Sequence, residues 1–280
     1  MRKSRLLLSC LAALVLLTAG IAPGKAHAEE GGSFLKIPVG LSYASTYWWR
    51  GVELNGKGSG VLWPSVGLVL GDTGISLLVA AGLDADYISA DTSGDRKAIR
   101  PLHEVDYGAS FAKDLGDIAS FSLGILYAQY PFYDDFDSTA VNPAFLEGSL
   151  GLGLKTILNP RVDFYYDYYM KESAAETPQD EDFYVKFSLG QEFAKTEDSA
   201  VTLSAWIGYY NNAYADLEGF SDAGLRLGFL KDFSGTAFAA GLYYARSLDS
   251  DFQRAYDPDG DGEGKIKNHV WADFSVSKTL

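Results

Sequence analysis

The stretch AFLEGSLGLGLKTILNPRVDFYYDYYMK, residues 144–171, holds two runs of alternating side chains separated by the tight turn Leu158-Asn159-Pro160. In its second run one face is polar or amphipathic, with Arg161, Asp163, Tyr165, Asp167, Tyr169 and Lys171. The other face is apolar or aromatic. A period of two predicts a β-strand whose two faces meet different surroundings. The short turn predicts that the two strands are antiparallel neighbours.

The same pattern continues outward from this pair and predicts twelve strands. Tight connections lie at 71–74, 114–117, 158–160, 195–199 and 232–235. Longer polar stretches lie between them, at 51–59, 88–102, 131–143, 172–182, 211–220 and 249–267. Short turns at one end and long loops at the other, with an even strand number, are typical of bacterial outer-membrane barrels. We therefore expect an all-β fold, a 12-stranded antiparallel up-and-down transmembrane β-barrel in the outer membrane of a Gram-negative bacterium.

A secreted β-sandwich also alternates, so the side chains on each face must decide between the two folds. The inward set is rich in Gly, Ser and charge, which would make a poor sandwich core. Aromatic residues gather near strand ends on the other face, as an interfacial girdle requires. This expected outward set is Tyr43, Tyr47, Trp49, Tyr87, Tyr107, Tyr127, Tyr166, Tyr168 and Tyr209. The first strand is expected to run unbroken over residues 35–50.

Residues 1–28 have the three parts of a secretory signal peptide: basic residues, an apolar run and Ala26-His27-Ala28 as a cleavage site. We expect the leader to be removed, leaving residues 29–280 as a single barrel domain. Cys10, the chain's one cysteine, lies in that leader. Disulfides and thiolate chemistry are therefore excluded for the remainder.

The chain is acidic, with a formal net charge of −14 at pH 7. Nucleic acid is not an expected partner, because neutralising phosphates needs Lys and Arg. The expected partners are outer-membrane lipid and the machinery that inserts barrels into it. A small polar solute is a further candidate partner.

Charged residues on the proposed inner face are candidates for lining a lumen. They are Arg50, Asp84, Asp86, Glu104, Asp106, Glu147, Arg161, Asp163, Asp167, Lys186, Arg226 and Asp273, with Lys36, Lys155, Lys171, Glu192 and Asp222 as further members. In one interpretation they pair across strands and hold the barrel narrow or shut. In the other they tune the selectivity of a polar conduit. The excess of acids favours cations or neutral solutes over anions.

Inward aromatic residues form two groups on opposite walls. They are Trp48, Trp63 and Trp271 on one wall and Tyr165, Tyr169, Tyr184, Trp206 and Tyr210 on the other. Facing rings could stack the flat faces of a sugar or nucleoside. They could equally be packing that fills the lumen.

One loop and two histidines complete the chemical candidates. Asp257, Asp259 and Asp261 precede Gly262 like the start of a calcium loop, but Asn268 stands where the bidentate Glu is needed. An acidic loop or a weak calcium site within 249–267 are the two interpretations, and no other cofactor is expected. His103 and His269 are the only plausible bases for catalysis, and neither lies in a nucleophile motif.

The run Ser45-Thr46-Tyr47-Trp48-Trp49-Arg50-Gly51-Val52 resembles the Ser-Asp-Tyr-x-x-Arg-Gly signature of a family of uncharacterised Gram-negative outer-membrane proteins, with Thr in place of Asp. The resemblance implies an outer-membrane barrel. For function we expect a narrow channel or binding barrel for small polar solutes, and not an enzyme. The alternatives are a closed structural or surface-interaction barrel with acidic outer loops and a lipid-modifying enzyme.

Overall fold

The computed structural model describes residues 34–53, 60–85, 102–129, 144–170, 181–212, 217–255 and 268–280. Its strands are β1 (Leu35–Lys36), β2 (Pro38–Ala44), β3 (Trp48–Trp49), β4 (Val52–Glu53), β5 (Val61–Leu70), β6 (Ile75–Asp84), β7 (Leu102–Leu115), β8 (Ala119–Gln129), β9 (Ala144–Leu154), β10 (Arg161–Met170), β11 (Glu181–Lys195), β12 (Ser199–Asn212), β13 (Leu217–Phe233), β14 (Thr236–Ser247) and β15 (Asn268–Thr279). A 3₁₀ turn, η2 (Gly71–Thr73), joins β5 to β6, and a short helix, α3 (Ser250–Ala255), follows β14.

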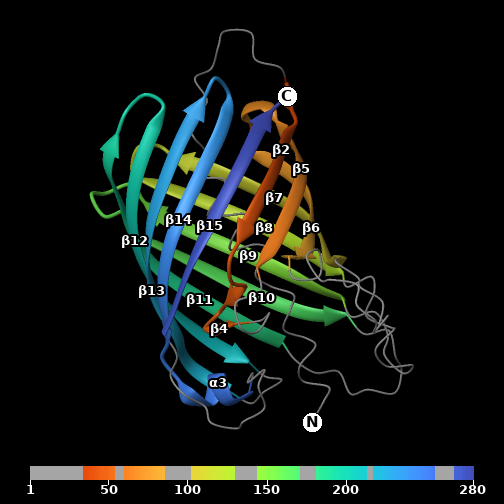
Figure 1. The fold of residues 1–280 in the computed structure, drawn as a ribbon, viewed down its shortest axis with the longest axis vertical. Coiled ribbons are helices and arrows are strands. Elements are labelled where there is room, and N and C mark those ends of the chain that lie inside the picture. Colours follow the sequence, from red (N-terminus) through yellow and green to blue (C-terminus); the bar gives the residue numbers. More distant parts are fainter. Residues whose placement is uncertain are drawn as a thin grey trace, which may run out of the picture.

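The sheet closes on itself. From β5 to β15 each wall strand pairs antiparallel with the next, and β15 pairs with β2 through contacts such as Ser275 opposite Ser42. β1 and β2 are two parts of one strand, separated at Ile37, so the wall has twelve strands. Closure leaves no unpaired edge, which a sheet in lipid requires. The expected fold is confirmed (Figure 1).

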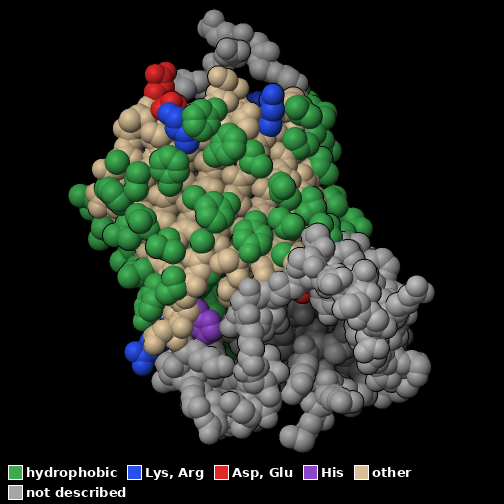
Figure 2. Space-filling view, in the orientation of Figure 1, with side chains coloured by type: hydrophobic (Ala, Val, Ile, Leu, Met, Phe, Trp, Pro, Cys, Tyr) green, Lys and Arg blue, Asp and Glu red, His purple; other side chains and the backbone are tan. Residues whose placement is uncertain are grey.

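The outer face is apolar over most of its height. Leu, Val, Ile and Phe side chains cover the wall, and charged groups collect near its ends (Figure 2). Leu150, Leu225 and Phe274, from three different strands, are 37%, 50% and 55% exposed. Period-two alternation puts these residues outward and the polar set inward, so the face toward lipid is the hydrophobic one.

The five tight turns predicted from the sequence join β5–β6, β7–β8, β9–β10, β11–β12 and β13–β14. They lie at the same end as Leu280, the upper end in Figure 1, and we call this the turn end of the barrel. The segment α3 lies at the opposite end, which we call the loop end. Among the described residues, no helix is both long and apolar enough to cross a membrane.

The prediction of one strand over residues 35–50 was wrong beyond Ala44. The chain leaves the wall there, and β3 and β4 form a separate two-stranded hairpin inside the barrel. Tyr47 and Trp49, expected on the lipid face, are only 2% and 1% exposed. The reason is energetic: the hairpin places two aromatic rings and a cation against partners on the inner wall, described below.

The loops expected at 211–220 and 249–267 were also partly wrong. β12 runs to Asn212, β13 begins at Leu217, and α3 occupies 250–255. The register between β12 and β13 shifts after Gly208, so that Ser221 is the extra residue of a β-bulge. The bulge lets both strands continue beyond the point where simple alternation ends.

Candidate functional site

The hairpin inside the barrel turns on Arg50 and Gly51. Trp49 pairs with Val52, and the two residues between them both have positive φ, 43° for Arg50 and 97° for Gly51. A two-residue turn with positive φ at both positions matches the twist of its strands. A Cβ at Gly51 would lie 2.8 Å from the carbonyl oxygen of Ser221 on β13, so the turn rests directly against the wall.

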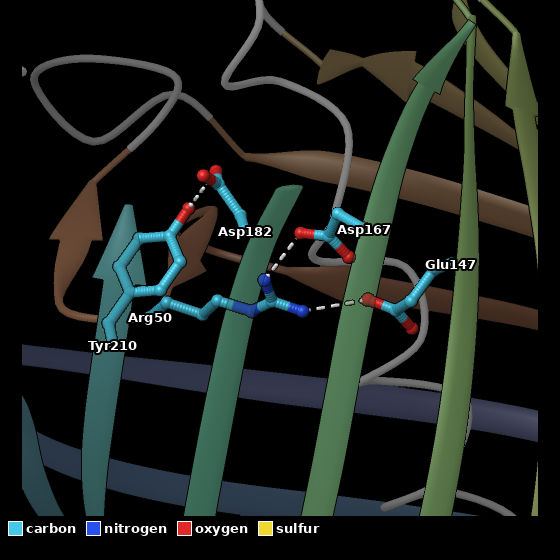
Figure 3. Close-up of polar contacts among 5 residues, drawn as sticks. All are labelled: Arg50, Glu147, Asp167, Asp182 and Tyr210. Carbon is cyan, nitrogen blue, oxygen red and sulfur yellow. Dashed lines mark hydrogen bonds and ion pairs between the residues drawn. The ribbon is translucent and has the colours of Figure 1, made fainter. Parts of the chain in front are cut away.

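Arg50 anchors the hairpin to the far wall. One guanidinium nitrogen donates to Asp167 Oδ2 on β10 at 2.6 Å, and the other to Glu147 Oε2 on β9 at 2.8 Å (Figure 3). The side chains of all three residues are at most 2% exposed. Charge-assisted hydrogen bonds of this kind are short and strong when solvent is excluded.

These two carboxylates belong to a row of three. Glu147 lies directly opposite Asp167, and Asp167 lies directly opposite Asp182 on β11. Like charges at facing positions of adjacent strands destabilise a sheet. Arg50 bridges the first two, and the Tyr210 hydroxyl on β12 donates to Asp182 at 2.9 Å (Figure 3). The row therefore requires the hairpin for its stability.

Aromatic rings enclose the same guanidinium. Its central carbon lies 4.8 Å from the Trp49 ring centroid and 5.1 Å from that of Tyr184. The ring centroids of Tyr165 and Tyr210 are both 5.5 Å away. Cation–π attraction is strengthened by desolvation, so the rings stabilise the charge that the carboxylates pair.

Two further contacts add to the packing in the loop-end half of the lumen. Tyr47 donates its hydroxyl to Glu104 Oε2 on β7 at 2.8 Å. Phe252 of α3 is 1% exposed and stacks on Tyr210, with centroids 5.7 Å apart and an interplanar angle of 18°. The hairpin and α3 thus converge on one set of wall residues from two different connections.

The aromatic residues around Trp48 and Trp271 pack against one another. Trp271 stacks on Tyr243 at 4.7 Å and on Trp48 at 5.8 Å, and Trp48 lies 4.4 Å from the His269 ring. These ring faces already contact one another. The observation favours lumen packing over solute stacking for this group.

On the turn-end side of the hairpin the inner wall carries small side chains. Inward positions toward the turn end include Gly40, Ser42, Ser65, Ser76, Ser110, Ser122, Ser149, Gly151, Ser188, Gly190, Ser204 and Ser277. Arg161 lies among them and is held by Asp163 and Ser122 at 2.6 and 2.8 Å. The inner wall therefore carries small side chains toward the turn end and aromatic rings toward the loop end.

The structure thus brings together many of the residues singled out from the sequence. The residues that meet at the hairpin are Arg50, Glu147, Asp167, Tyr165, Tyr184 and Tyr210. Those buried near Tyr47 are Glu104, Asp106 and Trp63. Those elsewhere on the inner wall are Asp163, Asp222, Trp206, Lys186, Arg161, Arg226 and Asp273. Asp84 is half-buried at the end of β6. Glu192 and Lys155 are exposed, paired with Lys195 and Asp114 near turns.

Other residues of the prediction lie outside the described part of the chain. They are Asp86, Lys171, the calcium-loop candidates Asp257, Asp259 and Asp261, and the side chains of His103 and Tyr169. Within the described residues no three His, Cys, Asp or Glu side chains are arranged so that they could hold a metal ion together. Asp182 and Phe252 were not predicted as site residues, because they lie in stretches expected to be loops. Asp182 shares the alternation of Tyr184 and Lys186, which was the available signal.

No protein-family profile and no curated protein sequence matches the chain. The motif resemblance therefore stays a prediction. Solved structures do match: an outer-membrane channel from Pseudomonas putida F1 has a TM-score of 0.52 at 11% identity, over 93% of this chain and 100% of that one. The translocator domain of the autotransporter NalP from Neisseria meningitidis has a TM-score of 0.52 at 13% identity, over 95% and 92%. The KdgM porin has a TM-score of 0.49 at 6% identity, over 87% and 99%.

At such low identity the likeness shows the fold alone. Together with the closed wall and its apolar outer face, it identifies the chain as a Gram-negative outer-membrane β-barrel of porin-like architecture.

Proposed function

We propose that this barrel is a narrow outer-membrane channel for small polar solutes, and that the hairpin of β3 and β4 forms its constriction. The observation that carries the proposal is the anchoring of Arg50 to Glu147 and Asp167 across the lumen. A segment that enters the lumen and is tied to the opposite wall narrows the path without interrupting the wall itself. The half of the inner wall on the turn-end side of the hairpin, which is rich in Ser and Gly, supplies a polar path to the turn end.

The experiment is single-channel conductance of the refolded chain without its leader in a planar bilayer, compared with Arg50→Gln. Loss of the guanidinium should release the hairpin, so the variant should conduct several times more than the parent. Lys195→Gln is the matched control, because Lys195 pairs with Glu192 in an exposed position near a turn. Its conductance should equal that of the parent.

A silent parent with a conducting Arg50→Gln variant would mean that the hairpin is a closed gate, which also supports the proposal. Silence from both chains, each shown to be folded by heat-modifiable gel mobility, would contradict it. The second candidate, a closed structural or surface-interaction barrel, would then be favoured. One observation already points that way: Phe252 and the hairpin pack together on Tyr210 at the loop end.

An enzymatic role has little support in the site. The His269 ring is tilted at 44° against the Trp48 ring, with centroids 4.4 Å apart, and packs in the aromatic group of the lumen. The proposal therefore remains transport or binding of solutes.

A further inference from the structure

Most of the described carboxylates of the inner wall are buried, whereas Asp84 and Asp273 are half-buried. Those with exposed fractions between 0% and 2% are Glu104, Asp106, Glu147, Asp167, Asp182 and Asp222. Two of them pair with Arg50, and others accept hydrogen bonds from tyrosine hydroxyls. Asp222 accepts three, from Tyr184 at 3.0 Å, Ser221 at 3.0 Å and Trp206 Nε1 at 2.7 Å. A solute in the lumen would therefore meet little of this negative charge.

Two cations on the turn-end side of the hairpin are half-buried rather than fully buried. Lys186 on β11 faces inward between Asp163 and Gly208 and is half-buried. Among the described residues its ammonium forms no ion pair with Asp163, which lies directly opposite it on β10, or with Asp222. Arg161 already holds Asp163, and Asp222 is saturated by the three donors above. Lys186 is thus a cation whose nearest acids are engaged elsewhere.

Arg226 on β13 is the second such cation. Its Nε donates to the Tyr243 hydroxyl at 2.7 Å, and that hydroxyl donates in turn to Asp273 at 2.7 Å. The tyrosine therefore separates Arg226 from the half-buried Asp273, and among the described residues Arg226 forms no ion pair. The side chain of Arg161 is 35% exposed despite its contact with Asp163.

From these observations we infer that the turn-end half of the lumen binds small anions, carboxylates among them, through Lys186 and Arg226, with Arg161 contributing. The inference names the solute class of the proposed channel and rests on that function. It opposes the preference suggested by composition, since the whole chain carries a net charge of −14. The two differ because burial and pairing remove acids from the lumen surface and leave bases on it.

The wall contains its own probe. β12 presents Ser204 opposite Arg226, then Trp206, then Gly208 opposite Lys186, so the Trp206 ring lies between the positions of the two cations. Trp206 is half-buried. The other four of the five tryptophans are at most 8% exposed. Collisional quenching of the chain's fluorescence should therefore report chiefly the ions that reach Trp206.

The test compares iodide with caesium as quenchers of the refolded barrel in detergent micelles. We expect iodide to have the larger quenching constant, because positive side chains in the lumen raise the local concentration of anions. Lys186→Gln and Arg226→Gln should each lower the ratio of the iodide to the caesium quenching constant by roughly twofold. Lys195→Gln, which removes an exposed lysine near a turn, should leave the ratio unchanged. Stronger quenching by caesium, or equal loss in the control, would overturn the inference.

Bilayer recordings separate this inference from the proposed function. The reversal potential is measured in gradients of potassium chloride or potassium acetate. A sign that shows anion selectivity, and a smaller value in Lys186→Gln, would support both the proposed channel and the anion site. Cation-selective conductance overturns the inference and leaves the channel intact. Silence combined with preferential iodide quenching contradicts the channel and upholds the anion site.

Discussion

At the scale of single residues, Arg50 joins the hairpin to the opposite inner wall. It forms ion pairs with two carboxylates that face one another on adjacent strands, and four aromatic rings surround it. Removing one partner of a buried, hydrogen-bonded ion pair leaves an uncompensated charge, which costs more than the pair contributes. Lys cannot reproduce this contact, because its ammonium has one nitrogen, whereas Arg50 reaches the two carboxylates with two separate nitrogens of a rigid planar group.

We therefore expect Arg50→Ala to lower the free energy of unfolding by about 3–5 kcal/mol. Arg50→Lys should recover less than half of that loss. Urea unfolding of the barrel in lipid vesicles, followed by tryptophan fluorescence, gives both values. The double variant Glu147→Gln/Asp167→Asn in the Arg50→Ala background should regain stability, and its failure to do so would show that the carboxylates are not what Arg50 stabilises.

At the scale of elements, the β3–β4 hairpin is held by a close backbone approach as well as by charge. Gly51 combines a φ of 97° with a position where a Cβ would contact the carbonyl oxygen of Ser221. Gly235, in the turn between β13 and β14, has a similar φ of 83° but nothing within 4 Å of a Cβ. Substitutions at the two glycines therefore distinguish the effect of backbone strain from that of close packing.

Gly51→Val should displace the hairpin and increase conductance, in addition to the roughly 1–3 kcal/mol cost of strained backbone. Gly235→Val should show the strain cost alone and keep the parent's conductance. A red shift of tryptophan emission in Gly51→Val, caused by exposure of Trp49, is the independent readout. Equal conductance in the two variants would argue that the hairpin does not limit the path.

At the scale of the whole molecule, the barrel separates two solvents. Leu225 lies near the middle of the long strand β13 and is 50% exposed on the apolar face. Its neighbours in sequence, Gly224 and Arg226, face the lumen. One strand thus presents lipid-compatible and water-compatible groups at consecutive positions.

Leu225→Arg should destabilise the barrel by about 2–4 kcal/mol, the cost of a cation near the bilayer midplane. Leu225→Ala is the control and should cost about 1 kcal/mol, since only apolar area is lost. Urea titration in vesicles measures both. If the two substitutions cost the same, Leu225 does not face hydrocarbon.

Local sequence determined the wall. Alternation of side chains and the positions of tight turns depend only on neighbours along the chain, so strand number, inward and outward faces and compartment could be predicted from residues such as those at 144–171. Glu147 and Asp167 lie directly opposite each other because of the register between β9 and β10.

The hairpin was decided by tertiary structure. Residues 45–50 continue the alternation of β2, and their local pattern does not show that they leave the wall. Arg50 is 97 residues from Glu147 and 117 from Asp167 along the chain. Whether Trp49 faces lipid or the lumen, and which of the inner charges stay accessible, depends on partners that only barrel closure brings within reach.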